Sequence, residues 1–179
     1  GTLITLATHI MGVINATPDS FSDGGTLYRD GRLELELSLR RARQMVAEGA
    51  HILDVGGEST RPGAASVGLQ QELDRVVPLV AAINAELDVA VSVGTISPQV
   101  MRESVAQGAG IINDVRALRR PGALQAAADT GATVCLMHMQ GAPDTMQQAP
   151  SYTDVVAEVG SFLQGRAKAC LAAGIPCEK

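Results

Sequence analysis

Three polar loops, each directly after a short apolar run, hold most of the residues in this chain that could take part in chemistry. The first loop, residues 15–25, combines acids, hydroxyls and glycines with one phenylalanine. The second covers residues 56–64 and the third residues 138–141. In α/β folds with parallel strands, ligands bind at the carboxyl ends of the strands. Three loops in the same relative position therefore predict one shared active face.

Asn15 stands at the carboxyl end of the first apolar run, and its amide oxygen is a candidate ligand for Mg²⁺. Mg²⁺ prefers octahedral oxygen coordination and is usually held by few protein groups together with substrate phosphates. The alternative is an asparagine that caps the loop backbone. On the residues alone, the capping role is favoured.

Thr60 and Arg61 offer a hydroxyl and a planar fork of five N–H donors, which suit an anionic or carboxylate-bearing ligand. The alternative is a surface arginine paired with Glu58. Glycines on both sides of this pair, at residues 56–57 and at Gly63, allow the backbone to approach a ligand closely. The glycines favour the ligand-binding interpretation.

Four further polar or polarizable residues lie in or beside apolar runs. Asp54 is predicted to be buried, which is costly unless the carboxylate is paired, so it either supports a loop or contacts a ligand. Asn113 can donate and accept at once, toward a ligand or the neighbouring backbone. Met137 could flank a flat ligand or pack in the core. His138 has no nucleophile motif beside it and is predicted to be structural.

Composition excludes several classes of protein. The chain has 179 residues, 46% hydrophobic residues and a net charge of -5, which predicts one domain with a sizeable core. With 2% aromatics and no basic stripe, nucleic-acid binding is not expected. Residues 1–8 show no charged n-region and no long apolar run, and no stretch reaches membrane length, so neither a secretory leader nor a membrane span is expected. Three cysteines without metal-type spacing predict reduced thiols and a cytoplasmic location.

The elements that must position these residues alternate between strand and helix. Continuous apolar runs predict strands buried in a parallel sheet, and three- and four-residue spacing predicts the helices between them. The expected strands are residues 10–14, 52–55, 89–93, 111–115 and 134–137, and the expected helices are residues 33–48, 69–87, 100–107, 123–128 and 155–172.

Such repeated βα units fit either a (β/α)₈ barrel or an open doubly wound sheet. A closed barrel needs eight strands and about 250 residues, whereas five strands are predicted here, and residues 174–179 lie where a sixth should begin. The expectation is a single domain over residues 1–179, truncated on its C-terminal side. Its open edges and bare apolar faces would make it a fragment or half of an assembly.

The two longer loops and residues 138–141 resemble dihydropteroate synthase, the folate-pathway enzyme that sulfonamide drugs inhibit. Residues 108–115 and 122–124 also match, so the resemblance spans nearly the whole chain while covering only the N-terminal part of the family. It favours the barrel and implies a partial (β/α)₈ TIM barrel of about five βα units. It also implies Mg²⁺ as cofactor and a homodimer when full length.

The resemblance implies a site as well as a fold. The implied reaction joins dihydropterin diphosphate to 4-aminobenzoate, forming 7,8-dihydropteroate and diphosphate. Asn15 would contact the metal and the diphosphate, and Asn113 the pterin. The remaining implied site residues are Phe21, Asp23 and Arg61 in catalysis, and Ser22, Asp54, Thr60, Pro62 and Met137 in substrate binding.

One position departs from the family pattern. Where the family has an aspartate after the third strand, this chain has Gly94, which cannot accept hydrogen bonds through a side chain. Two alternatives therefore stay open beside the synthase. One is an inactive pterin-binding or assembly fragment, and the other is a methyltetrahydrofolate methyltransferase domain, against which the loop at residues 17–25 argues.

Overall fold

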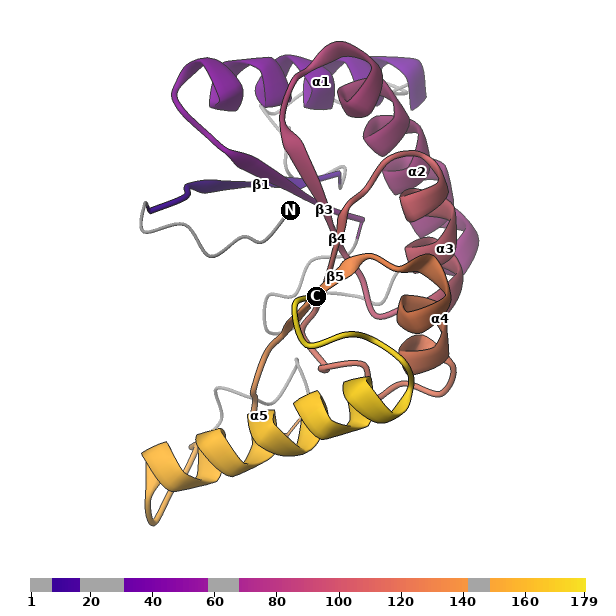
Figure 1. Ribbon diagram of the computed structural model, residues 1–179. Helices are drawn as coiled ribbons and strands as arrows, with labels where there is room; N and C mark the ends of the chain where they lie inside the picture. Colours follow the sequence, from indigo (N-terminus) through magenta and orange to yellow (C-terminus); the bar gives the residue numbers. More distant parts are fainter. Residues whose placement is uncertain (1–7, 17–30, 58–67, 142–148) are drawn as a thin grey trace.

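The computed structural model describes residues 8–16, 31–57, 68–141 and 149–179 (Figure 1). Its centre is a five-stranded sheet in which every neighbouring pair is parallel and the strands lie in chain order. An open doubly wound sheet changes direction at a switch point and would not keep this order. The expected barrel-type arrangement of five βα units is confirmed. The strands are β1 (Met11–Asn15), β2 (Ile52–Gly56), β3 (Ala90–Gly94), β4 (Ile111–Asp114) and β5 (Thr133–Leu136).

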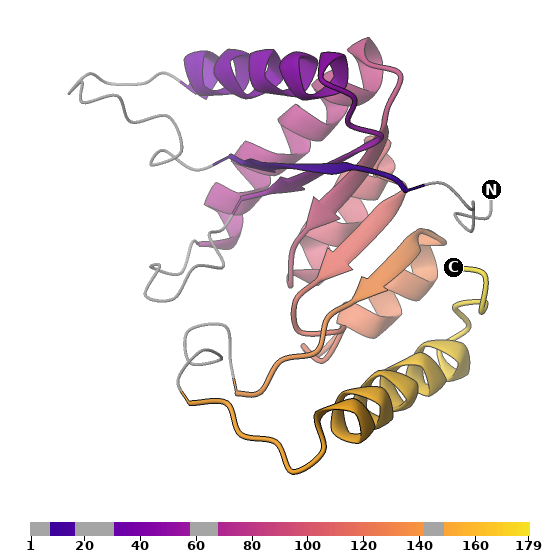
Figure 2. The ribbon, with the colours of Figure 1, turned by 90° about the vertical axis from the view of Figure 1, so that its left-hand side faces the viewer.

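Five helices follow the strands and lie around the outer side of the sheet in an arc (Figure 1). Because all neighbouring strands are parallel, their carboxyl ends meet at one edge of the sheet, as the direction of the arrows in Figure 2 shows. The helices are α1 (Gly31–Ala47), α2 (Leu69–Glu86), α3 (Pro98–Ala106), α4 (Ala123–Thr130) and α5 (Val155–Ala172).

The predicted boundaries of the strands agree with the structure within one residue at each end. Two differences between predicted and observed boundaries, one at a helix and one at a strand, have clear physical causes. Helix α3 begins at Pro98, not at residue 100, because proline suits the first helical turn, where its missing N–H costs nothing. β4 ends at Asp114 because that side chain bonds the amides of the following turn. Met137 lies just beyond β5 rather than inside it.

The two faces of the sheet differ in burial. Residues that point toward the helices, such as Leu53, Val55 and Val93, are fully buried in the core. The opposite face, here called the inner face, is more open at β1, where Met11 and Val13 are 37% and 54% exposed. β2 is buried along its whole length, as expected for a central parallel strand. The expectation of burial on both faces is therefore wrong for β1, which is an edge strand.

The chain returns to the sheet after α5. The backbone N–H of Val134 on β5 donates to the carbonyl oxygen of Lys179 at 2.8 Å. This hydrogen bond places the last residues beside the edge of β5 that β4 leaves free, as Figure 1 also shows. This bond attaches the last residues to the free edge of β5, while the sheet itself has five strands.

Candidate active site at the carboxyl ends of the strands

Two rows of residues cross the inner face. The lower row joins Val13, Asp54, Ser92 and Ile111 as register partners on successive strands. The upper row, at the carboxyl ends, joins Asn15, Gly56, Gly94, Asn113 and Cys135. Register partners, and residues two apart on one strand, share a face of a sheet. The structure therefore places Asn15 and Asn113 at the same end of the sheet and on the same face.

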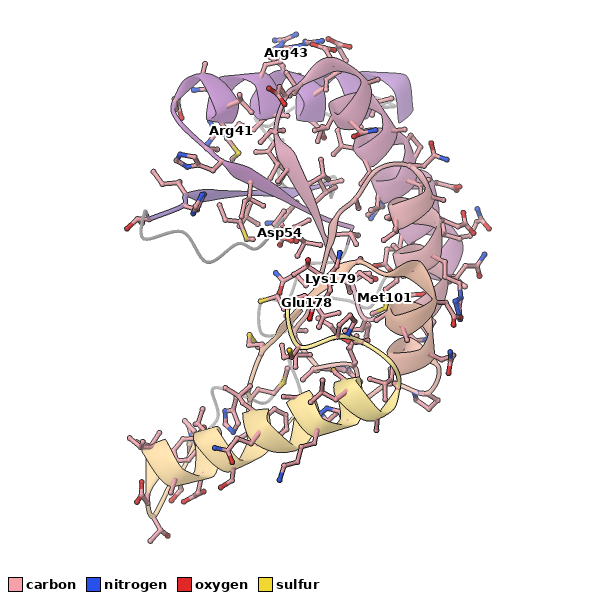
Figure 3. The ribbon with its side chains drawn as sticks, viewed as in Figure 1. Arg41, Arg43, Asp54, Met101, Glu178 and Lys179 are labelled. Atoms are coloured by element: carbon pink, nitrogen blue, oxygen red, sulfur yellow. The ribbon has the colours of Figure 1, made fainter. Side chains whose placement is uncertain are left out.

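Asp54 is the centre of a small hydrogen-bond network on this face, and it is labelled in Figure 3. Its Oδ1 accepts a 2.6 Å hydrogen bond from the hydroxyl of Ser92, and its Oδ2 accepts a 3.2 Å hydrogen bond from Nδ2 of Asn113. Ser92 is fully buried and Asp54 is 7% exposed. Within the described part of the chain, its partners are thus two side chains on other strands and not loop amides.

Asn15, in the upper row, is the predicted ligand for Mg²⁺. Its side chain is partly buried at the end of β1 and has no hydrogen-bond partner among the described residues. Its amide oxygen is therefore available to a ligand. The same ranges of the chain contain no group of three or more His, Cys, Asp or Glu side chains that could hold a metal ion.

Cys135 completes the upper row on β5. Desolvation of its thiol, together with the negative charge of Asp54, raises the pKa of Cys135 above its ordinary value. The thiol therefore stays protonated at neutral pH.

A second buried carboxylate supports the loop after β3. Thr95 Oγ1 donates to Glu72 Oε1 at 2.5 Å and accepts from the backbone N–H of Ser97 at 3.0 Å. Glu72 lies in the first turn of α2, where a negative charge is favoured by the helix dipole. Gly57 is required here, since a Cβ would lie 2.7 Å from Val76 and 2.9 Å from Glu72.

Asp114 holds the turn that follows Asn113. Its carboxylate accepts hydrogen bonds from the backbone N–H groups of Arg116 at 2.7 Å and Leu118 at 2.9 Å. Burial raises the pKa of Asp114, and the two backbone hydrogen bonds oppose that rise. Ala117 and Leu118 adopt φ of 51° and 57°, in the left-handed region. The carboxylate thus fixes a strained turn directly behind the site.

Sequence reasoning missed Ser92, Glu72 and Asp114 as residues that support the site. For Asp114 a signal existed, because an aspartate whose carboxylate bonds amides two residues on is typical of turns. Ser92 and Glu72 carried no comparable signal. Their partners, Asp54 and Thr95, lie 38 and 23 residues away in the chain.

Met137 and His138 follow β5 directly in the chain and lie in different surroundings. Met137 is partly buried just after β5. The ring of His138 packs edge-on against Phe162 of α5, with centroids 5.0 Å apart, and lies 5.9 Å from Tyr152. Among the described residues, aromatic packing thus accounts for the structural role expected of His138. Six predicted site residues lie outside the described residues: Phe21, Ser22, Asp23, Thr60, Arg61 and Pro62.

Five sequential parallel βα units, with polar side chains gathered at the carboxyl ends of the strands, define a barrel-type α/β protein. Residues 11–179 match the family described as pterin binding enzyme, and the chain belongs to that family. Over 171 residues it is 54% identical to dihydropteroate synthase of Escherichia coli K12, a match that covers 96% of this chain and 59% of that protein. The expected family is confirmed.

Solved structures give the same result. A Yersinia pestis dihydropteroate synthase in complex with a sulfonamide drug is 50% identical, with a TM-score of 0.84 over 94% of this chain and 59% of that one. A Xanthomonas albilineans dihydropteroate synthase with 4-aminobenzoic acid is 49% identical, with a TM-score of 0.84 over 95% and 58%. The chain is a homologue of dihydropteroate synthase, and it spans about three fifths of the length of these relatives.

No helix among the described residues is long and apolar enough to cross a membrane.

Proposed function

We propose that this chain acts as a dihydropteroate synthase. The reaction joins the hydroxymethyl carbon of a dihydropterin diphosphate to the amine of 4-aminobenzoate, and it releases diphosphate. The observation that carries the proposal is the hydrogen-bonded pair Asp54 and Asn113 at the carboxyl ends of the strands, in a chain 54% identical to a dihydropteroate synthase. A carboxylate beside an amide suits the edge of a pterin ring, which both donates and accepts hydrogen bonds.

The proposed reaction requires little proton transfer by protein side chains. An aromatic amine is already neutral at pH 7, so no strong general base is required. The catalytic contribution is positioning of the two substrates and stabilisation of the negative charge on the departing diphosphate. Asn113 would orient the pterin, and the polarizable side chain of Met137 would flank the ring.

Mg²⁺ fits the upper row at one position. The amide oxygen of Asn15 is partly exposed and has no partner among the described residues, and Mg²⁺ is often bound by one or two protein oxygens with the rest of its shell from water and phosphate. When bound there, the ion would neutralise charge on the diphosphate. Asn15 itself would set the position of the diphosphate relative to the end of β1.

The proposal also assigns roles to residues outside the described ranges. The family resemblance supports Phe21, Asp23 and Arg61 in catalysis. The same resemblance supports a single pterin-binding domain over residues 1–179, a cytoplasmic location and a homodimer in a full-length version. It also supports substrate-binding roles for three more residues, namely Ser22, Thr60 and Pro62.

A second candidate function is a pterin-binding chain without synthase activity. Gly94 favours it, because this position of the upper row offers a ligand no side chain. A methyltetrahydrofolate methyltransferase domain is less well supported, since the relatives reported above are dihydropteroate synthases.

One experiment separates these candidates. The purified chain is given dihydropterin diphosphate, labelled 4-aminobenzoate and Mg²⁺, and dihydropteroate is measured, while calorimetry measures binding of 6-hydroxymethylpterin. We expect both binding and product, and Asn113→Ala should weaken pterin binding about tenfold or more. Gln107→Ala is the matched control, because this exposed amide lies at the far end of α3. Binding without product would support the second candidate, and no pterin binding would refute both.

A further inference from the structure

Helix α5 packs on the rest of the molecule through few side chains. Among its 18 residues, all of which the structure describes, Cys170 alone is buried, and Val155 and Val156 are 52% and 80% exposed. The helix begins near the carboxyl ends of the strands and runs back toward their amino ends (Figure 2). Contacts at a few positions, rather than a broad apolar face, therefore determine where α5 lies.

Phe162 of α5 touches two loops at once. Its ring packs against that of His138, with centroids 5.0 Å apart and ring planes at 86°. The guanidinium carbon of Arg119 lies 5.4 Å from the centroid of the same phenylalanine ring. His138 follows β5 and Arg119 follows β4. Because edge-to-face and cation–π contacts favour defined geometries, one side chain of α5 links the segments that follow two neighbouring strands.

This link lies where the pairing of the strands has ended. Asp114 and Leu136 are the last register partners of β4 and β5, and beyond them no backbone hydrogen bond among the described residues joins the two segments. Asn113 stands one residue before that point on β4, and Met137 stands one residue after it on the other segment. The position of Met137 relative to Asn113 is thus not fixed by the sheet alone.

The segment after β4 is anchored to α5 at two points. Nε of Arg119 donates to the carbonyl oxygen of Arg116 at 3.1 Å, which ties the guanidinium to the turn. Arg166 lies four residues after Phe162 and so on the same side of the helix. It donates to the carbonyl oxygens of residues 117–118 in the same turn. One side of α5 therefore holds the turn that follows Asp114.

The segment after β5 is held from a second direction. Tyr152, just before α5, has its ring centroid 5.9 Å from that of His138. Nε2 of Gln140 donates to the carbonyl oxygen of Ser151 at 2.7 Å, and its Oε1 accepts from the N–H of Ser151 at 3.0 Å. Met137 precedes His138 directly, so the contacts of His138 with the two aromatic rings restrict where Met137 lies.

We propose that Phe162 is a positioning residue of the site, which fixes Met137 relative to Asn113 through its contacts with His138 and Arg119. The inference rests on the proposed function, because it concerns how the pterin is held. Phe162 itself touches no substrate in this assignment and acts through Met137. A phenylalanine that only stabilised α5 would affect the binding of both substrates equally.

The first test compares the two substrates. Phe162→Leu keeps an apolar side chain and removes the ring, so calorimetry should show binding of 6-hydroxymethylpterin weakened about threefold to tenfold. Binding of 4-aminobenzoate, measured with diphosphate and Mg²⁺, should change less than about twofold, because its carboxylate is expected at Thr60 and Arg61 after β2. Phe162→Tyr should restore pterin binding, since it keeps the ring.

Controls separate this effect from a loss of folding. Leu171→Ala is the matched variant, because Leu171 is 52% exposed on the same helix and should leave binding of both ligands unchanged. Arg119→Gln is the second variant. It removes the cation from the ring at an exposed position and should weaken pterin binding about twofold to fivefold. Circular dichroism melts establish that each variant is folded, and Arg119→Gln decides the matter if Phe162→Leu does not fold.

A double-mutant cycle tests whether Phe162 acts through Met137. Met137→Ala should itself weaken pterin binding, because the ring loses a polarizable neighbour. In that background Phe162→Leu should add less than about a twofold loss, since residues that act as a unit are not additive. Full additivity would show that Phe162 does not act through Met137 and would overturn the inference.

The outcomes distinguish the inference from the function on which it rests. Folded Phe162→Leu that binds pterin as tightly as the unaltered chain would overturn the inference and leave the proposed function intact. An equal loss for pterin and 4-aminobenzoate would do the same, because it indicates a structural role alone. An unaltered chain that binds neither ligand would refute the proposed function itself.

Discussion

Asp54 and Asn113 are 59 residues apart in the chain and on strands that are not neighbours, yet their side chains share a 3.2 Å hydrogen bond. The bond links β2 to β4 over Gly94. It makes the carboxylate and the amide a unit, so a change in one alters what the other presents to a ligand. Energies of residues coupled in this way are not additive.

A double-mutant cycle at positions 54 and 94 should reveal this coupling. Gly94→Asp supplies a second carboxylate beside the first, so it can take over the ligand's N–H donors. We expect Asp54→Asn to weaken pterin binding about tenfold to a hundredfold in the unaltered chain and only a few-fold in the Gly94→Asp background. Calorimetric titration of all four proteins measures both costs. Equal costs in the two backgrounds would show that the two positions act independently.

Arg166 of α5 should stabilise the turn behind Asn113. Its Nε donates to the carbonyl oxygen of Ala117 at 2.8 Å, and its Nη2 donates to that of Leu118 at 3.2 Å. Arg166→Ala should lower the free energy of unfolding by about 1–3 kcal/mol, because both carbonyls lose a charged donor. Arg166→Lys should recover only part of the loss, since an ammonium lacks the planar fork. Urea denaturation measures the change, and full recovery with lysine would argue against the two-pronged contact.

Asp114 should make stability depend on pH in a defined direction. Burial raises its pKa in the folded state above the unfolded value. For a carboxyl group so shifted, the stabilisation is fully present below the unfolded pKa and is lost as pH rises through the folded pKa. The stability of the unaltered chain relative to Asp114→Asn should therefore decrease as pH rises through that range. Urea melts of both proteins from acid to neutral pH give the difference, and a flat difference would contradict the prediction.

The exposed inner face of β1 should promote self-association. Met11 and Val13 are 37% and 54% exposed on an edge strand, and such apolar edges favour pairing with another chain. Sedimentation velocity should find oligomers or aggregates of the 179-residue chain. Met11→Lys should shift the distribution toward monomer, since a charge on an edge strand opposes pairing. A monodisperse, cooperatively folding monomer before the substitution would refute this expectation.

Much of the fold was predictable because the pattern is local. The apolar spacing located α5 at the predicted residues, and in the structure the helix begins just after Asp154, whose side chain accepts from the N–H of Ala157. Strand order followed from the family resemblance. What could not be predicted depends on contacts between distant segments.

Gly94 illustrates the limit most clearly. In the sequence, Gly94 stands where the family pattern has an aspartate, so a carboxylate is missing at this position. In the fold it is also the space through which Asp54 reaches Asn113. That second role depends on the register of three strands, which no local pattern specifies. The predicted roles of Asn15 and Met137 remain predictions, as do those of the predicted site residues within 17–30 and 58–67.

The sequential order of the strands has a consequence for how the protein is made. Each strand pairs only with the strands that come just before and just after it in the chain. A unit can therefore dock on the sheet as soon as it has left the ribosome, without waiting for a distant partner. The register partners on neighbouring strands, such as Met11 and Ile52, are nevertheless separated by a whole βα unit, so each step closes a loop of that length. The order of the strands in the sheet thus allows it to grow in the direction of synthesis, from β1 to β5.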